Sequence, residues 1–221
     1  MRPLRIATLA KAPRPGFAKT RLIPALGAHG AAELAARMLR TTLIAAIEAG
    51  VGTVELCVTP DIDDDAWRGI DLPADIGITA QGDGDIGVRM ARIARRAHAQ
   101  GEGLLLIGTD CAEMSPALLR DAATLLDDTD AVLHPTLDGG YALIGLNRHS
   151  PWLFDDIPWS TERVAELTLR RFAMLGWTVA VGRMLHDIDD PGDLRWLGME
   201  VPASSSPPNP NPSRPTEKSP A

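Results

Sequence analysis

The residues GLLLIGTD at positions 103–110 determine the architecture that we predict for this chain. The first five, Gly103–Ile107, form a wholly apolar run, which predicts a buried strand. Asp110 follows directly, at the position where open α/β sheets bind their ligands. Its carboxylate is a hard oxygen ligand suited to Mg²⁺ or Mn²⁺, and Gly108 allows a ligand to approach the backbone closely. The alternative interpretation is that Asp110 only caps the turn or helix that follows.

Strands and helices alternate on both sides of this segment. Further strands are expected at residues 4–10, 53–59, 131–134, 141–146 and 178–181, and helices at 29–49, 86–100, 115–126 and 161–175. This alternation is typical of an α/β protein with a largely parallel sheet. We expect one domain over residues 1–200. The Pro/Ser-rich residues 201–221 have almost no apolar side chains, which predicts a disordered tail.

The composition narrows the classes of partner. The net charge of −7 disfavours a nucleic-acid partner or an anionic membrane surface, which would need a basic field. No apolar run approaches the roughly 18 to 20 residues that a membrane span needs. Cys57 and Cys111 are the only cysteines and form no CxxC motif, which favours a reduced, cytoplasmic protein. A site for a phosphorylated ligand must therefore be a local basic feature.

Such a feature follows the first predicted strand, in KAPRPGFAKTRL at residues 11–22. Its cations are Lys11, Arg14, Lys19 and Arg21, and Gly16 helps to fix the path of the loop. A stiff loop of cations can neutralise the charge of a diphosphate or triphosphate. It is neither a Walker A loop nor a GxGxxG motif. A solvated basic loop is the alternative, but this loop is expected at the same sheet edge as Asp110.

A second acidic segment, HDIDD at residues 186–190, follows the last predicted strand. Alternate residues of an extended segment share a face, so Asp187 and Asp189 can point at one cation. Together with Asp110 they supply carboxylates from two distant parts of the chain. Mg²⁺ commonly takes one or two carboxylates and completes its shell with phosphate oxygens and water. Which of Asp187 and Asp189 binds the metal stays open, and Asp190 is expected to start the short helix at Pro191.

Three more segments carry candidate binding residues. Asp138-Gly139-Gly140-Tyr141 is a tight turn before a strand, and its glycines permit a left-handed turn or close approach of a ligand. A hairpin turn alone also explains it. Gln81 and Gly82 precede a helix that Asp85 is expected to cap. Trp159-Ser160-Thr161 has the character of an aromatic wall followed by a helix N-cap.

Six segments occur in this order along the chain: KAPRPGFAKTRL, QGDGDIGVRM, GTDC, DGGYALIGL, WST and DIDDPGDL. Together they resemble a bacterial family of GT-A-type transferases in the nucleotide-diphospho-sugar transferase superfamily, often labelled glycosyltransferases of unknown substrate. The layout is more distantly similar to the molybdenum-cofactor and phospholactate nucleotidylyltransferases. The resemblance covers about residues 4–197. Ala112 and His134 depart from the family's usual proline and glycine, which leaves the acceptor pocket open.

The resemblance implies a three-layer α/β/α sandwich with a mixed, mainly parallel sheet. It also implies that Asp110 holds the metal and that Asp187 or Asp189 completes the metal site. Lys19 and Arg21 match the family's KTRL cations and are expected, with Asp110, to be catalytic. The expected nucleotide contacts are Lys11, Arg14, Gly16, Lys19, Arg21, Gln81, Gly82, Asp138, Gly139, Gly140 and Tyr141.

Three functions are compatible with this pattern. The first is nucleotidylyl transfer from a nucleoside triphosphate to a small acceptor, with Mg²⁺ or Mn²⁺ stabilising the developing charge. The second is glycosyl transfer from a nucleotide-diphospho-sugar, and the third is an inert nucleotide-binding module. Lys19 and Arg21 favour the first slightly, because a loop with two cations suits a triphosphate. The acceptor, the base and the oligomeric state are left open.

Overall fold

The protein is built on one sheet of seven strands, in the order β3-β2-β1-β4-β6-β5-β7. The computed structural model describes residues 2–199, so the predicted tail at 201–221 lies outside the described residues. The strands are β1 Leu4–Lys11, β2 Thr53–Thr59, β3 Gly77–Ala80, β4 Gly103–Ile107, β5 Ala131–Pro135, β6 Tyr141–Leu146 and β7 Val179–Val181. Strand β6 runs antiparallel to β4 and β5, and the other neighbours are parallel. The sheet is mixed and mainly parallel, as predicted.

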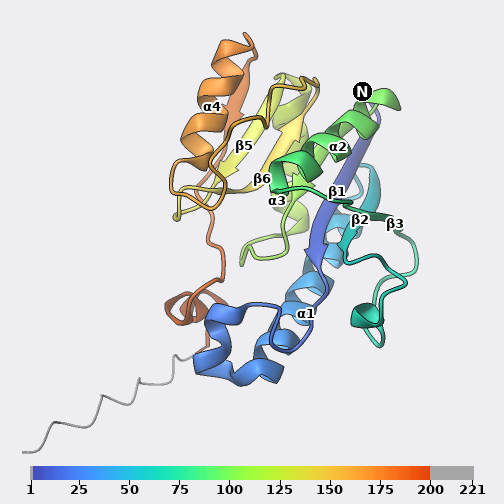
Figure 1. Ribbon diagram of the computed structural model, residues 1–221. Coiled ribbons are helices and arrows are strands. Elements are labelled where there is room, and N and C mark those ends of the chain that lie inside the picture. Colours follow the sequence, from blue (N-terminus) through green and yellow to red (C-terminus); the bar gives the residue numbers. More distant parts are fainter. Residues whose placement is uncertain (1, 200–221) are drawn as a thin grey trace, which may run out of the picture.

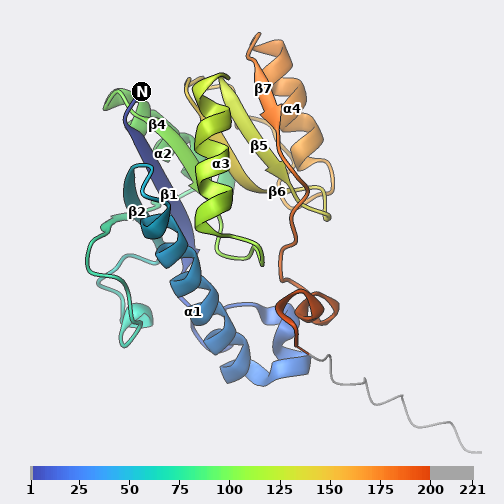
Figure 2. The same ribbon diagram turned by 180° about the vertical axis from the view of Figure 1, so that it is seen from behind.

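Helices cover both faces of this sheet (Figures 1 and 2). They are α1 Ile23–Ala49 and α3 Pro116–Asp127 on one face, and α2 Ile86–Ala99 and α4 Val164–Met174 on the other. Neighbouring strand residues point to opposite faces, so Ile6 packs with α1 and α3 while Ala7 packs with α2. The predicted three-layer α/β/α sandwich is confirmed. No helix within residues 2–199 has both the length and the apolar character needed to cross a bilayer.

The ends of most elements follow the sequence pattern closely. Strands β2, β4 and β6 have the predicted bounds, and Gly50 ends α1 in the left-handed conformation at φ 65°. Helix α1 begins before the predicted residue 29, although Gly27 interrupts it with φ 71° and ψ 166°. Helix α4 begins later than predicted, because the Thr161 hydroxyl donates to the Pro158 carbonyl at 2.7 Å in the preceding turn. The short 3₁₀ helices are η1 Thr20–Leu22, η2 Asp65–Trp67 and η3 Pro191–Leu197.

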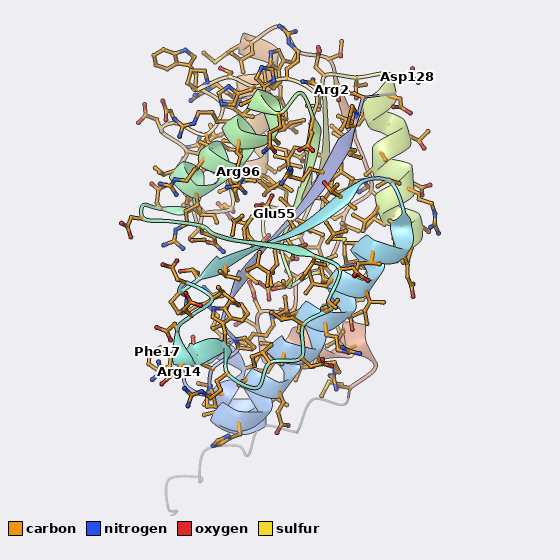
Figure 3. All side chains as sticks on the ribbon, turned by 90° about the vertical axis from the view of Figure 1, so that its right-hand side faces the viewer. Arg2, Arg14, Phe17, Glu55, Arg96 and Asp128 are labelled. Carbon is orange, nitrogen blue, oxygen red and sulfur yellow. The ribbon has the colours of Figure 1, made fainter. Side chains whose placement is uncertain are left out.

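A buried ion-pair cluster fixes α2 on the sheet. Glu55 of β2 is 2% exposed and accepts hydrogen bonds from Arg5 of β1, at 2.7 Å, and from Arg96 of α2 (Figure 3). Burial alone raises the pKa of Glu55, but hydrogen bonds from Thr79 and Arg5 and the charge of Arg96 lower it below its usual range. Removing Glu55 would deprive both arginines of their shared buried carboxylate partner. The cluster therefore fastens the last turn of α2, where Arg96 lies, to the sheet.

Candidate active site at the carboxyl edge of the sheet

Three carboxylates from distant parts of the chain gather at the carboxyl edge of the parallel strands. Asp110 follows β4, and Asp187 and Asp189 follow β7. Two backbone hydrogen bonds of 2.9 Å fasten the segments together, from Ala112 N to His186 O and from Ile188 N to Asp110 O. We refer to Asp110, Asp187 and Asp189 as the carboxylate cluster. Their predicted meeting at one edge agrees with the structure.

Lys19 reaches into this cluster from the loop after β1. Its side chain is only 5% exposed, and its ammonium group donates to Asp110 Oδ1 and, at 2.7 Å, to the Ile188 carbonyl. Asp189 Oδ1 lies 4.0 Å away. The backbone of Lys19 is left-handed, with φ 44° and ψ 50°, which residues with side chains adopt rarely and which is common at functional sites. The Asp110 carboxylate is therefore paired with Lys19 and is not the simple helix cap of the alternative interpretation.

The carboxylate cluster holds more negative charge than Lys19 neutralises. Burial, with the charges of Asp110 and Asp189, raises the pKa of Asp187 to about 7. Burial and the charge of Asp110 also raise the pKa of Asp189, although Lys19 and Arg21 act in the opposite direction. Carboxylates held together in this way favour a bound cation. The donor chemistry therefore fits Mg²⁺ or Mn²⁺.

The protein alone does not supply a complete metal shell. Within residues 2–199, no three His, Cys, Asp or Glu side chains converge closely enough to form a metal-ligand group. Mg²⁺ does not require one, because it usually retains waters and takes further oxygens from substrate phosphates. The residues that would hold the metal are Asp110 with Asp187 or Asp189. The identity of the metal ligands stays a prediction.

A cavity of about 540 Å³ opens beside the carboxylate cluster. The start of α2 and the β5–β6 hairpin give it an apolar wall that includes Ile86, Met90 and Tyr141, and Trp159 closes one side. Gly87 permits this packing, because a Cβ atom there would lie 2.4 Å from Trp159 Nε1. Arg21, Asp138 and the loop residues Ser160–Glu162 supply polar groups. One side of the cavity is therefore apolar, and the other side, at the carboxylate cluster, is charged.

A second, smaller cavity of about 240 Å³ meets the first at the carboxylate cluster. Both are lined by Arg21, Asp138, Asp187 and Asp189. The smaller cavity is also lined by His186, which stacks on Trp196 with ring centroids 3.7 Å apart. The His186 ring contacts Glu113, and its backbone N–H donates to the same carboxylate at 3.1 Å. Two ligands can therefore approach the carboxylate cluster from two sides.

Several predicted nucleotide contacts lie outside both cavities. Lys11 donates to the Phe17 carbonyl at 3.2 Å, and the Arg14 guanidinium stacks on the Phe17 ring at 4.5 Å (Figure 3). Gly16, in the same loop, has φ 80°. The positive φ at Gly16 matches the conformational role expected of it. Contact of Lys11 and Arg14 with a nucleotide stays a prediction.

Gln81 and the hairpin glycines have structural partners in the fold. The Gln81 amide is buried and donates to the carbonyls of Ala10 at 3.0 Å and Cys57 at 2.7 Å, so it ties β1 to β2. Gly82, beside it, packs against the Arg92 guanidinium. Gly139 lies against the backbone of Glu162, whereas Gly140 and Tyr141 line the larger cavity. Asp138 Oδ1 accepts from Gly140 N at 3.0 Å and so shapes the turn as well.

Sequence reasoning missed part of the cavity wall. Ile86, Met90 and Glu162 line the larger cavity, but none of them was predicted as a binding residue, although Ile86 and Met90 lie within the segment QGDGDIGVRM. Ile86 and Met90 belong to the same apolar pattern as the core residues of α2, which gives no sign that they face a cavity. Ser160 has a left-handed backbone with φ 63°, which its side-chain type does not signal. Asp85 caps α2 as predicted, accepting from Val88 N at 2.9 Å.

In metal-free buffer, we expect Asp187→Asn to stabilise the fold, and to do so more strongly at pH 8 than at pH 5. The pKa of Asp187 is raised from 3.8 to about 7, so between these values the folded state retains a proton that the unfolded chain has released. The free energy of unfolding therefore falls as pH rises through this window, on the order of 2 to 4 kcal/mol by pH 8. Asparagine does not ionise, so the variant should not lose this part of the free energy of unfolding. Urea unfolding with EDTA at both pH values measures the difference.

Asp83→Asn is the matched control, since Asp83 is an exposed loop residue. It should leave the pH dependence of unfolding as in the wild type. Excess Mg²⁺ should shrink the stability gain of Asp187→Asn, because a bound cation stabilises the charged carboxylate. If the free energy of unfolding depends on pH in the same way in Asp187→Asn and the wild type, the negative charge of Asp187 does not destabilise the folded protein.

Comparison with known proteins gives the chain a family and structural relatives. Residues 42–161, more than half of the chain, match the family model described as "Uncharacterized protein conserved in bacteria (DUF2064)". No curated protein matches the chain significantly. A solved structure from Desulfovibrio desulfuricans G20, provisionally assigned as a nucleotide-diphospho-sugar transferase, is 28% identical with a TM-score of 0.82. That alignment covers 93% of this chain and 90% of the other.

More distant solved structures share the fold. CMP:2-keto-3-deoxy-manno-octonic acid synthetase, solved with CTP, is 11% identical with a TM-score of 0.55 over 88% of this chain and 96% of that chain. A Mycobacterium tuberculosis H37Rv protein in complex with manganese is 19% identical with a TM-score of 0.50, over 88% and 97%. With the Desulfovibrio structure, these likenesses confirm the predicted GT-A, or nucleotide-diphospho-sugar transferase, fold.

Proposed function

This chain belongs to the DUF2064 family, and we propose that it is a metal-dependent transferase that moves a nucleotidyl group from a nucleoside triphosphate to a small acceptor. The similarity to a protein provisionally assigned as a nucleotide-diphospho-sugar transferase supports a nucleotide-using transferase in general. The CTP complex and the manganese complex of proteins with the same fold are consistent with a nucleotide and a divalent metal. Nucleotidylyl transfer is the more specific part of the proposal.

The observation that carries the proposal is the carboxylate cluster at the junction of two cavities. Asp187 and Asp189 line both cavities, so a donor in one and an acceptor in the other would meet there. The residues of the described chain that line the larger cavity include five carboxyl groups and a single guanidinium, that of Arg21. A polyphosphate entering this cavity would be repelled without additional positive charge. Nucleotide binding is therefore expected to require the metal.

The reaction itself needs few groups from the protein. An oxygen of the acceptor forms a bond to the α-phosphorus, the bond from that phosphorus to the bridging oxygen breaks, and pyrophosphate leaves with the electron pair. A bound Mg²⁺ supplies positive charge to the phosphate oxygens as this charge develops. Arg21, which lines both cavities, is placed to bind phosphate oxygens, and the apolar wall with Trp159 excludes water from one side. Asp110 and its neighbours position the cation.

Glycosyl transfer is the second candidate, and the Desulfovibrio relative favours it. In that reaction the acceptor oxygen bonds to the anomeric carbon of the sugar, and a nucleoside diphosphate leaves. The same carboxylate cluster would serve, because charge again develops on the departing diphosphate. Arg21 and Lys19 in one loop favour the triphosphate reaction, since a nucleoside triphosphate carries more negative charge than a nucleotide-diphospho-sugar.

Product analysis distinguishes these reactions. The protein is incubated with Mg²⁺, a panel of small acceptors and either the four nucleoside triphosphates or common nucleotide-sugars. We expect pyrophosphate release from a triphosphate that stops when EDTA is added. Turnover of nucleotide-sugars alone, with release of nucleoside diphosphate, would support glycosyl transfer instead. Metal-dependent nucleotide binding without any turnover over a broad acceptor panel would support an inert binding module.

A further inference from the structure

The ammonium group of Lys19 is bonded to Asp110 and lies 4.0 Å from Asp189, two of the carboxylates predicted to hold a metal ion. We infer that it is the resident counter-ion of the carboxylate cluster, and that a divalent cation takes its place on Asp110 when the metal enters with the nucleotide. The inference rests on the proposed function only in taking a nucleotide as the ligand that accompanies the metal. It assigns Lys19 a role in regulating metal occupancy, in addition to phosphate binding.

The burial of Lys19 separates it from the other cations of its loop. Its side chain is 5% exposed, whereas Lys11, Arg14 and Arg21 are exposed. The left-handed backbone at Lys19 starts η1, and Leu22 N donates to the Lys19 carbonyl at 2.9 Å. Both features direct one long side chain inward. A buried ammonium group is unfavourable unless it is paired, and all of its contacts here are with the carboxylate cluster or the Ile188 carbonyl between its members.

Lys19 and a metal ion compete for the same oxygen. The ammonium group is bonded to Asp110 Oδ1, and the Asp110 side chain is 48% exposed, so a cation can reach it from solvent. A divalent ion held by Asp110 would lie close to the ammonium group and repel it. The tethered side chain would then need a new anionic partner. A phosphate group of the nucleotide that enters with the metal would supply one.

This competition predicts that metal and nucleotide bind cooperatively. A metal ion alone must break the Lys19–Asp110 pair without compensation, which weakens its binding. With a nucleotide present, the displaced ammonium group binds phosphate, and part of that loss is recovered. Because coupling between two ligands is reciprocal, the metal strengthens nucleotide binding by the same factor. The carboxylate cluster would thus bind free divalent ions weakly and the metal–nucleotide complex more tightly.

The test is Mn²⁺ binding, followed by the electron paramagnetic resonance signal of free Mn²⁺, with Mn²⁺ alone and then with a non-hydrolysable nucleoside triphosphate analogue. Lys19→Met should bind Mn²⁺ alone about tenfold or more tightly than the wild type, because three carboxylates lose their counter-ion. It should also lose most of the enhancement that the nucleotide gives. Lys11→Met, which removes the same charge from an exposed position of the same loop, should match the wild type in its binding of Mn²⁺ alone, because Lys11 donates to the Phe17 carbonyl and does not contact the carboxylate cluster. Equal or weaker binding of Mn²⁺ alone by Lys19→Met would overturn the inference.

A measurement on the unaltered protein tests the same inference without depending on whether the Lys19→Met variant folds. Acetylation of lysines by acetic anhydride, read by mass spectrometry, should modify exposed Lys11 readily and Lys19 slowly. With Mn²⁺ and the nucleotide analogue both present, Lys19 should pair with phosphate and remain slow to react. Saturating Mn²⁺ alone should raise the acetylation rate of Lys19 severalfold. Protection of Lys19 that does not change with Mn²⁺ would contradict displacement. Neither readout depends on turnover, so absence of transfer would defeat the proposed reaction and leave this inference standing.

Discussion

Asp110→Asn is expected to lower metal-dependent turnover by about a hundredfold to a thousandfold, the loss usual for a group that stabilises developing charge. Asp110 is the carboxylate of the cluster that follows β4 and remains 48% exposed toward solvent. Asparagine keeps its size and removes the charge that a metal ion requires. Steady-state release of pyrophosphate measures the loss, and titration calorimetry with Mg²⁺ and nucleotide measures the accompanying loss of affinity.

The fold should survive this substitution. Lys19 loses its carboxylate partner but keeps its hydrogen bond of 2.7 Å to the Ile188 carbonyl and its proximity to Asp189. We expect a loss of roughly 1 to 2 kcal/mol in the free energy of unfolding, measured in urea. Asp83→Asn, in an exposed loop, is the isosteric control and should retain full activity. Unchanged metal-dependent affinity in Asp110→Asn would remove Asp110 from the metal site.

Gly139→Ala should be the most destabilising single change at the site. Gly139 has φ 87°, and a Cβ atom there would lie 2.0 Å from the Glu162 carbonyl oxygen and 2.4 Å from its carbonyl carbon. Its own carbonyl accepts from Ala165 N at 2.8 Å, so the hairpin and the loop before α4 are docked backbone to backbone. The clash and the left-handed conformation together should cost about 3 kcal/mol or more. Urea unfolding measures this loss.

Gly176→Ala separates the two causes. Gly176 also has a positive φ, of 65°, but a Cβ atom there would meet no other part of the described chain within 4 Å, so only the backbone conformation is penalised. That change should cost about 1 to 2 kcal/mol. Gly139→Ala should in addition impair activity, because Ser160–Glu162 form part of the cavity wall. If both alanine variants lose the same stability, the close approach at Gly139 is not a constraint on the fold.

The sequence predicted the strands of the core better than the edges of the sheet. The apolar run Gly103–Ile107 has the predicted bounds because a strand buried on both faces leaves a continuous apolar signal. Strand β3, Gly77–Ala80, escaped prediction because it is short and mostly exposed at the edge, where burial imposes no pattern. The early start of α1 was missed because Gly27 breaks the helical spacing.

At the site, the order of strands was enough to predict which loops meet, but not how their side chains pair. Asp110, Asp187 and Asp189 lie together because parallel strands end at one edge, as expected. The Lys19–Asp110 pair depends on a left-handed residue that is not glycine, and no local signal predicts it. The separation of Lys11 and Arg14 from the cavities likewise depends on contacts with Phe17 inside the loop.

The backbone pairing of residues 110–112 with 186–188 joins an early and a late part of the chain, so the carboxylate cluster is completed only near the end of synthesis. Figures 1 and 2 show the late segment lying beside the first turns of α1, where Ile188 and Leu194 pack with Leu22 and Leu34. A ribosome exposes the segment with Asp110 well before the segment with Asp187. A nascent chain that has formed β1 to β6 therefore still lacks two of its three carboxylates. The metal site that we propose would therefore be complete only after residues 186–188 have paired with residues 110–112, and metal affinity would then be a marker of completed folding.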